Sequence, residues 1–245
     1  ARWPENGSTI KNVQGTRTSL SSPNLVGIES LVGSRVVVQN TAWSFETRTV
    51  VSHNGGQITL NSPLSVDPQN YGWGFWFIGK LSFLTSPGEW YYDSSSKTIY
   101  VNSNEPQNID FVTRDVLWYT SYNGVGQVRT NEKFFGASSA AVRIECGTNN
   151  GLDRCEIGNS FVGVRITHNP GIVPSSGNYV TNCIINNCYE SAINSLSERA
   201  LISGNTFSNI GVVPGLGTDT WGYTALNSSS GKDNVISYNH MSNLG

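Results

Sequence analysis

The sequence predicts an all-β fold in which a solenoid of stacked strands follows a smaller antiparallel β region. Two observations lead to this prediction. The C-terminal half repeats a strand pattern at irregular intervals, as solenoid turns joined by variable loops do. The composition is also poor in charge, at 13%, and contains 26 Gly residues, which is typical of β proteins whose polar surface comes from hydroxyl and amide groups.

Four segments of the C-terminal half carry the repeat. Each has a Cys or Asn, an apolar residue two positions later, and an Asn two positions after that. Because a spacing of two is strand spacing, we expect all three positions to point to one face, into the coil. One turn earlier the same positions fall on Glu132, Phe134 and Gly136. The three columns are Cys155, Cys183, Asn205 and Asn239; Ile157, Ile185, Phe207 and Met241; and Asn159, Asn187, Asn209 and Asn243.

Stacking explains how Asn residues can point inward. An unpaired buried amide costs about 1–3 kcal/mol, but amides on neighbouring turns can bond to one another and to turn backbone. The segments LDRCEIGN, YVTNCIINN, LISGNTFSN and VISYNHMSN resemble the pectate lyase-like, right-handed parallel β-helix proteins, which carry asparagine ladders at the bend between sheets. An antiparallel β-sandwich with its Asn residues in turns is the alternative.

A second strand follows each repeat and supports the coil. These strands read AVRI (141–144), GVRI (163–166), SAIN (191–194) and YTAL (223–226), so each turn has at least two strands. The loops 168–178 and 212–223 interrupt the turns. Both are rich in Gly and Pro, and we expect them to project from the coil, where binding residues often lie.

The N-terminal half contains antiparallel strand signals. A strand is predicted at 34–39, two more within 43–60 around a His-Asn-Gly-Gly turn, and a hairpin at 90–101 with its turn at 94–97. The phrases ARWPE and LTSPGEWYYD resemble the front part of bacterial β-helix proteins that act on or near polysaccharides, where a small β-domain is interposed. We therefore predict an N-terminal β region, 1–118, packed on coil turns, 119–245, in one continuous unit. Four aromatic residues of the N-terminal half are expected in the core: Trp73, Trp76, Trp90 and Tyr92.

Charge and cysteine usage exclude several classes of protein. The net charge is −2 and the 15 basic residues are scattered, so we expect no nucleic-acid partner. No signal peptide or membrane span is visible. The four Cys residues lack a CxxC pair, which argues against zinc; Cys155 and Cys183 are read as core residues, with a disulfide left open. Because the chain begins without Met and stops inside a repeat, we expect a module of a larger secreted protein that carries a catalytic domain.

Catalytic groups are sparse at the positions that the resemblance singles out. Hydrolases related to polygalacturonase pair two acids before the second strand, and the matching positions here hold a single carboxylate, Glu190. Lyases of this fold use an Arg or Lys as the base. Arg143 and Arg165 on adjacent turns, with Glu145, are candidates, although a solvated Arg pair balanced by Glu145 and Glu190 is the simpler interpretation. No cofactor is predicted; calcium is possible, but no Asp cluster supports it.

Aromatic residues favour a binding function. Seven Trp and ten Tyr residues with few charges suit a neutral polysaccharide, because the C–H face of a sugar packs on an aromatic ring. The predicted platform consists of Trp221, Tyr223, Tyr189 and Glu190 with Arg165 and Asn194, and the second choice is Trp118 and Tyr119.

The function expected from these residues is that of a non-catalytic carbohydrate-binding module for plant cell-wall polysaccharide. The chain resembles the β-helix xylan-binding modules of bacterial xylanases, which implies xylan as its ligand. The alternative is a β-helix polysaccharide lyase or glycoside hydrolase, or a fragment of one.

Overall fold

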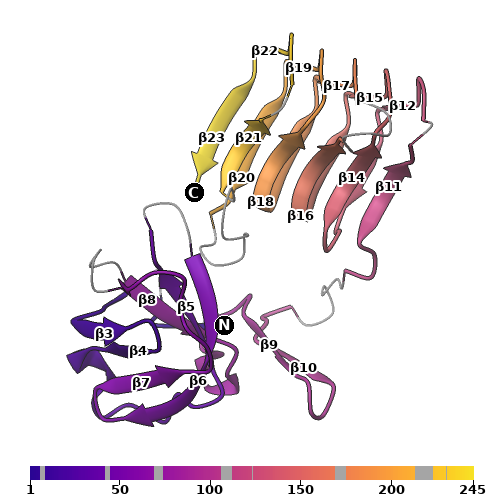
Figure 1. The fold of residues 1–245 in the computed structure, drawn as a ribbon. Coiled ribbons are helices and arrows are strands. Elements are labelled where there is room, and N and C mark those ends of the chain that lie inside the picture. The colour runs from indigo at the N-terminus through magenta and orange to yellow at the C-terminus, as the bar shows by residue number, and fades with distance from the viewer. Residues whose placement is uncertain are drawn as a thin grey trace. The chain divides into compact units, whose positions relative to one another are not determined.

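The computed structural model describes nine stretches of the chain: residues 1–5, 9–41, 45–68, 74–105, 112–122, 124–168, 175–212, 223–229 and 231–245. It divides into two compact units, residues 1–109 and 110–245, and each is described by itself (Figure 1). Unit 1 is an antiparallel β-domain and unit 2 is a parallel β-solenoid, as the sequence predicts.

Unit 1 is built on one antiparallel sheet in the order β1-β8-β5-β6-β7-β4-β3, with β2 pairing with β8. The predicted strand 34–39 and the two strands around the Gly55-Gly56 turn are confirmed. A core of Val36, Val38, Ile58, Phe75 and Phe77, among others, lies against the sheet. Its elements are β1 (Arg2–Trp3), β2 (Ile10–Lys11), β3 (Gln14–Thr16), β4 (Ser19–Ser21), η1 (Pro23–Leu25), β5 (Arg35–Gln39), β6 (Phe45–Asn54), β7 (Gln57–Leu60), β8 (Gly74–Ile78), η3 (Leu81–Phe83), β9 (Trp90–Asp93) and β10 (Thr98–Val101).

The predicted hairpin is present as β9 and β10, but its aromatic face is not part of the core. Trp90 is 60% exposed and Tyr92 is 47% exposed, so their placement in the core is wrong. Among the described residues the two strands form a two-stranded sheet of their own, so alternation along β9 does not bury either face. Trp76, in the middle of β8, is buried as expected, and Trp73 lies outside the described residues.

Unit 2 stacks parallel strands that run side by side from the pink β11 to the yellow β23 in Figure 1. One sheet has the order β12-β15-β17-β19-β22; the other has the order β11-β14-β16-β18-β20-β23, with β13 pairing with β16 and β21 with β18. Its strands are β11 (Val116–Thr120), β12 (Val128–Thr130), β13 (Lys133–Phe135), β14 (Ala140–Glu145), β15 (Gly151–Asp153), β16 (Glu156–Thr167), β17 (Tyr179–Thr181), β18 (Ile184–Ser195), β19 (Leu201–Ser203), β20 (Thr206–Ile210), β21 (Thr224–Ser228), β22 (Val235–Ser237) and β23 (His240–Leu244).

The turns of the coil form three walls. Wall 1 is the sheet β12-β15-β17-β19-β22. The long strands β16 and β18 belong to both other walls: their first halves join β13, β20 and β23 in wall 2, and their second halves join β11, β14 and β21 in wall 3.

The corners between walls share one backbone conformation and recur at a fixed spacing. Within a turn, positions five residues apart have a positive φ, between 47° and 80°. This left-handed conformation favours Gly and Asn, and these two residues hold eleven of the fifteen places. Turn by turn, the corners are Gly126, Asn131 and Gly136; Asn149, Arg154 and Asn159; Gly177, Asn182 and Asn187; Arg199, Gly204 and Asn209; and Asp233, Tyr238 and Asn243.

The first two repeat columns point inward, as predicted. Phe134, Ile157, Ile185, Phe207 and Met241 are successive register partners, and the first four of them are buried. In the other column, Cys155, Cys183 and Asn205 are buried, and each backbone N–H donates to the side chain one turn later. The four cysteines are free thiols, so Cys155 and Cys183 form no disulfide.

The third column does not point inward, and that prediction is wrong. Asn159 and Asn187 are exposed because each sits at a corner, where a positive φ breaks the strand alternation. Their amides still form a ladder on the surface: Asn187 donates to Asn159 at 3.2 Å and Asn209 to Asn187 at 3.0 Å. A second inner ladder, which lies outside the three repeat columns, begins with Asn150 and Asn178. Both are fully buried, and Asn178 accepts a bond from the Asn150 backbone at 2.9 Å.

Candidate functional site

The outer face of wall 3 carries one column of polar side chains. Tyr119, Arg143, Arg165, Asn194 and Asn227 are register partners on five successive strands. In each strand, the preceding position belongs to the inner column. Since side chains alternate across a strand, the polar column faces outward.

Glu145 contacts the side chains at the β11 end of this column. It accepts bonds from the hydroxyl groups of Tyr119, at 2.5 Å, and Tyr122, at 3.3 Å, and it pairs with Arg143 at 3.4 Å. The bond from Tyr119 is the main reason why the pKa of Glu145 is lowered, and the same bond raises the pKa of Tyr119. The Nε of Arg143 is buried and has no partner in the described part of the chain. Tyr119 as a whole residue is 49% exposed, so its side chain is accessible to a ligand.

Arg165 and Glu190 form the next part of the site. Their charged groups are 3.8 Å apart, and Glu190 is only 5% exposed. Glu190 lies where the register between β16 and β18 shifts by a residue, which turns its side chain toward Arg165. The Glu190 carbonyl accepts a bond from the backbone N–H of Tyr223 at 3.1 Å. The backbone of Tyr223 is thus held beside that of Glu190, whose side chain pairs with Arg165.

The predicted platform residues divide into three groups. Tyr119, Arg165, Glu190 and Asn194 lie on wall 3, and Tyr223 lies at the start of its last strand, with its backbone bonded to Glu190 and its side chain beside Gly211. Tyr189 is exposed beside Glu190 in the same strand. The other two are placed differently: Trp118 packs in the core on Phe134, with their ring centroids 6.5 Å apart and Arg129 over its ring, while Trp221 and most of the 212–223 loop lie outside the described residues.

Asn227 belongs to the column but was missed. The sequence alignment of SAIN with YTAL places Leu226 beside Asn194. The register instead pairs Asn194 with Asn227, because Tyr223 has a φ of 69° and the strand begins only at Thr224. Aligning SAIN with TALN would have found it.

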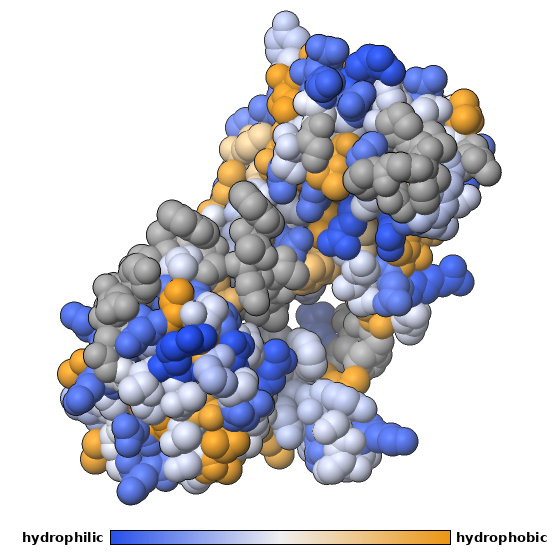
Figure 2. Space-filling view, in the orientation of Figure 1, coloured by the Kyte–Doolittle hydropathy of each residue, from blue (hydrophilic) through white to orange (hydrophobic). Residues whose placement is uncertain are grey.

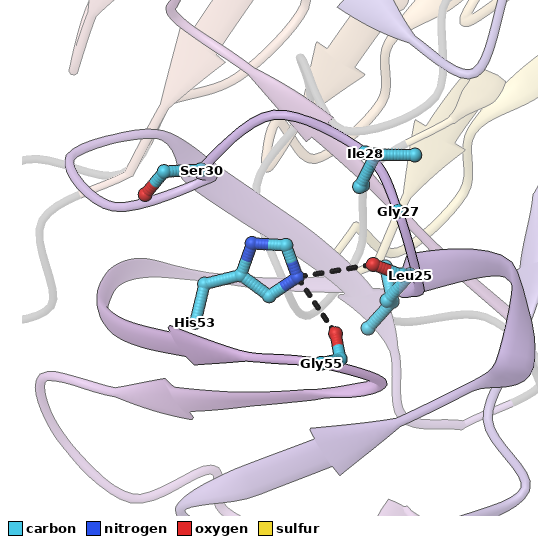
Figure 3. Close-up of a pocket in the computed structure, with 6 residues that line it drawn as sticks. All are labelled: Leu25, Gly27, Ile28, Ser30, His53 and Gly55. Atoms are coloured by element: carbon cyan, nitrogen blue, oxygen red, sulfur yellow. Dashed lines mark hydrogen bonds between the residues drawn. The ribbon is translucent and has the colours of Figure 1, made fainter.

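A hollow in unit 1 lies around His53. It has a volume of about 240 Å³ and is lined by six residues, Leu25, Gly27, Ile28, Ser30, His53 and Gly55 (Figure 3). The Nδ1 of His53 accepts the Leu31 backbone N–H, so Nε2 carries the proton and donates to the carbonyls of Leu25 and Gly55 at 3.2 and 3.0 Å. Both ring nitrogens are therefore occupied by backbone.

The described ranges carry neither a metal-binding cluster nor a membrane-spanning helix. These hold no group of three or more His, Cys, Asp or Glu side chains arranged to bind a metal ion. Nor do they contain a helix of the length and hydropathy that a membrane crossing requires. On the face drawn in Figure 2, apolar residues form separate patches among polar ones.

Comparison with known proteins adds little to this picture. No family model and no curated protein matches the chain. Two solved structures are similar over most of it. The tailspike gp61 of Pseudomonas phage phi297 is 12% identical over 83% of this chain, with a TM-score of 0.26. The tailspike gp49 of Pseudomonas phage LKA1 is 11% identical over 82%, also with a TM-score of 0.26.

The chain spans 34% and 41% of the lengths of these two tailspikes. At such identities and TM-scores the likeness says nothing about the ligand of this chain. The solenoid fold is established by the parallel strand pairing within unit 2.

Proposed function

We propose that this chain is a non-catalytic carbohydrate-binding module whose ligand is a neutral plant cell-wall polysaccharide of the xylan class. In this proposal it serves a secreted enzyme, to whose catalytic domain it is covalently linked.

The observation that carries the proposal is the outward column of wall 3. It combines an exposed ring, Tyr119, with two guanidinium groups and two amides at successive rungs, which are about 4.8 Å apart. Aromatic rings pack on the C–H faces of sugars, and guanidinium and amide groups bond to sugar hydroxyls.

The charge of this column favours a neutral ligand. Arg143 is paired with Glu145, and Arg165 with Glu190. A site for an acidic polymer would need cations in excess of anions, whereas each guanidinium here has its own carboxylate. The two Arg–Glu pairs therefore supply hydrogen-bond donors and acceptors without creating a strong net electrostatic field.

Affinity electrophoresis against xylan, mixed-linkage glucan, pectin and cellulose tests the proposal. We expect retardation in xylan gels, and weaker retardation when Tyr119→Ala and Asn194→Ala are combined. Thr206→Ala, on the outer side of wall 2, is the matched control and should migrate like the wild type. A wild-type chain that migrates unchanged in all four polysaccharides would refute a binding function.

An enzyme is the second candidate, because Glu145 and Glu190 place two carboxylates, each beside an arginine, on one wall. A lyase would use Arg143 or Arg165 as its base. Incubation with the same polysaccharides, with and without calcium, followed by assays for reducing sugar and unsaturated products, separates the two. Turnover that is lost in Glu190→Gln and in Arg165→Ala would establish the enzyme and overturn the binding module.

A further inference from the structure

Wall 1 presents an aromatic ring held flat against its outer surface. A Cβ added at Gly151 would lie 2.1–2.4 Å from three ring atoms of Tyr179, the register partner on the next strand. The ring therefore occupies the space that any larger side chain at position 151 would fill. Gly151 itself is buried beneath it.

Two parallel rows run along this wall from turn to turn. The first is apolar and contains the Tyr179 ring with three exposed aliphatic side chains. The second lies two residues further along each strand and is mostly hydroxyl groups. In order, the rows are Val128, Gly151, Tyr179, Leu201 and Val235, and Thr130, Asp153, Thr181, Ser203 and Ser237.

The polar row is ordered and nearly neutral. The Thr181 hydroxyl donates to Asp153 at 3.0 Å, and the hydroxyls of Ser203 and Ser237 are bonded at 3.0 Å. Asp153 also pairs with Arg154 at 2.9 Å, which offsets its charge. Hydroxyl oxygens that donate within the row keep lone pairs that can accept bonds from a ligand.

The dimensions of the rows fit a single sugar chain. They lie about 6.6 Å apart along the strands, and five rungs extend over about 19 Å. A β-linked pyranose chain presents C–H faces along its middle and hydroxyl groups along its edge. Such a chain can cover the apolar row and bond to the polar row at the same time.

A protein partner fits this surface less well. A stable protein interface buries about 800 Å² on each partner around an apolar centre. The apolar row of wall 1 is one side chain wide and is flanked by hydroxyl groups. That width suits a polymer one sugar ring across.

We propose that wall 1 is a second glycan-binding face, on which a neutral β-linked glycan chain lies along the coil and stacks on Tyr179. The choice of ligand class rests on the proposed function, but the site shares no residue with wall 3. A chain with two such faces would hold polymeric glycan more tightly than either face alone.

Variants of wall 1 test the proposal in affinity electrophoresis with soluble xylan. We expect Tyr179→Ala and Leu201→Ala each to weaken the affinity by about threefold or more. Tyr179→Phe should bind like the wild type because it keeps the ring, and Gly151→Ala should weaken binding because it displaces that ring. Thermal melting checks that each variant is folded; Leu201 is exposed, so its truncation leaves the core intact.

The possible outcomes distinguish the proposal for wall 1 from the proposed function, which rests on wall 3. If Tyr179→Ala and Leu201→Ala bind xylan like the wild type while the wall 3 variants lose binding, wall 1 is not a glycan face and the proposed function stands. If the wild type binds no glycan, both proposals fail. If Tyr179→Ala instead breaks up an oligomer in sedimentation velocity, with xylan affinity unchanged, the row is a protein interface and the glycan proposal is wrong.

Discussion

Asn205 and Asn239 are joined twice across neighbouring turns of the coil: the backbone N–H and the Nδ2 of Asn205 donate to the same Asn239 oxygen, at 3.1 and 2.9 Å. Asn205 also accepts the Cys183 N–H and donates to the Val180 carbonyl, both at 2.9 Å. One buried amide thus satisfies two backbone groups of the preceding turn, the Cys183 N–H and the Val180 carbonyl, which explains why an Asn can replace Cys in this column.

Replacing Asn205 with Ala should destabilise unit 2 by about 2–4 kcal/mol, because a buried N–H and a buried carbonyl lose their partners. Urea unfolding followed by circular dichroism measures the change. Asn209→Gly is the matched control: it removes amides from the surface ladder and keeps a residue suited to a positive φ. Its effect should stay within about 1 kcal/mol. Equal losses in the two variants would contradict the distinction between inner and outer ladders.

The alternation of side chains along a strand predicts the inner columns correctly. It fails at the corners, where the alternation is interrupted. Ile157 and Cys155 follow the simple period of two, but the chain turns at Asn159, so counting two further residues gives the wrong face. The five-residue recurrence of Asn or Gly, as in Gly177, Asn182 and Asn187, is the sequence signal that would have placed the corners.

The site was predictable only in pieces. Arg165, Glu190 and Asn194 could be grouped because their segments align, whereas Tyr119 joins them only through the stacking of β11 on β14. Trp90 and Tyr92 are expected in the core from their alternation along the strand, and both are exposed. Their alternation is the same whether a second layer covers the hairpin or not, so the pattern alone cannot assign burial.

The buried cysteines should be unreactive in the folded chain. Burial raises the pKa of the Cys183 and Cys188 thiols to about 12, so both remain protonated at pH 8. A disulfide-exchange reagent at pH 8 should react slowly with the native protein and with all four thiols after denaturation. Since an unfolded thiol ionises near pH 9, stability should fall as the pH rises above that value. Rapid labelling of the native chain would contradict this burial.

Asp93 at the tip of the β9–β10 hairpin should titrate near pH 2. The Ser95 hydroxyl, followed by the backbone of Ser95 and the hydroxyl of Ser96, lowers its pKa from 3.8 to about 2. A depressed carboxyl pKa stabilises the folded hairpin above about pH 4, and this contribution is lost as the pH falls through 2. Carbon-13 NMR of the carboxyl group gives the midpoint, which should rise in Ser95→Ala. A midpoint of 3.8 in the wild type would show that Ser95 and Ser96 do not form their hydrogen bonds to Asp93.

Trp221→Ala should weaken retention on insoluble xylan without changing thermal stability. Trp221 lies outside the described residues, and its expected role comes from its place in the loop that leads to Tyr223. Trp221→Phe, which keeps a ring, is the control and should retain most of the binding. Unchanged retention of the Ala variant would remove this loop from the site.

Tyr119 offers the sharpest test of the wall 3 column, because its ring and its hydroxyl can be removed separately. Tyr119→Ala should weaken xylan affinity by about three- to tenfold, the range expected for one stacked aromatic ring. Tyr119→Phe should keep most of the affinity, since the ring stays. Losing the hydroxyl should nevertheless raise the pKa of Glu145 toward its ordinary value, because the bond from Tyr119 is the main cause of its depression. Carboxyl NMR and affinity electrophoresis on the same two variants measure both effects. An Ala variant that binds like the wild type would mean that Tyr119 only positions Glu145 and does not touch the glycan.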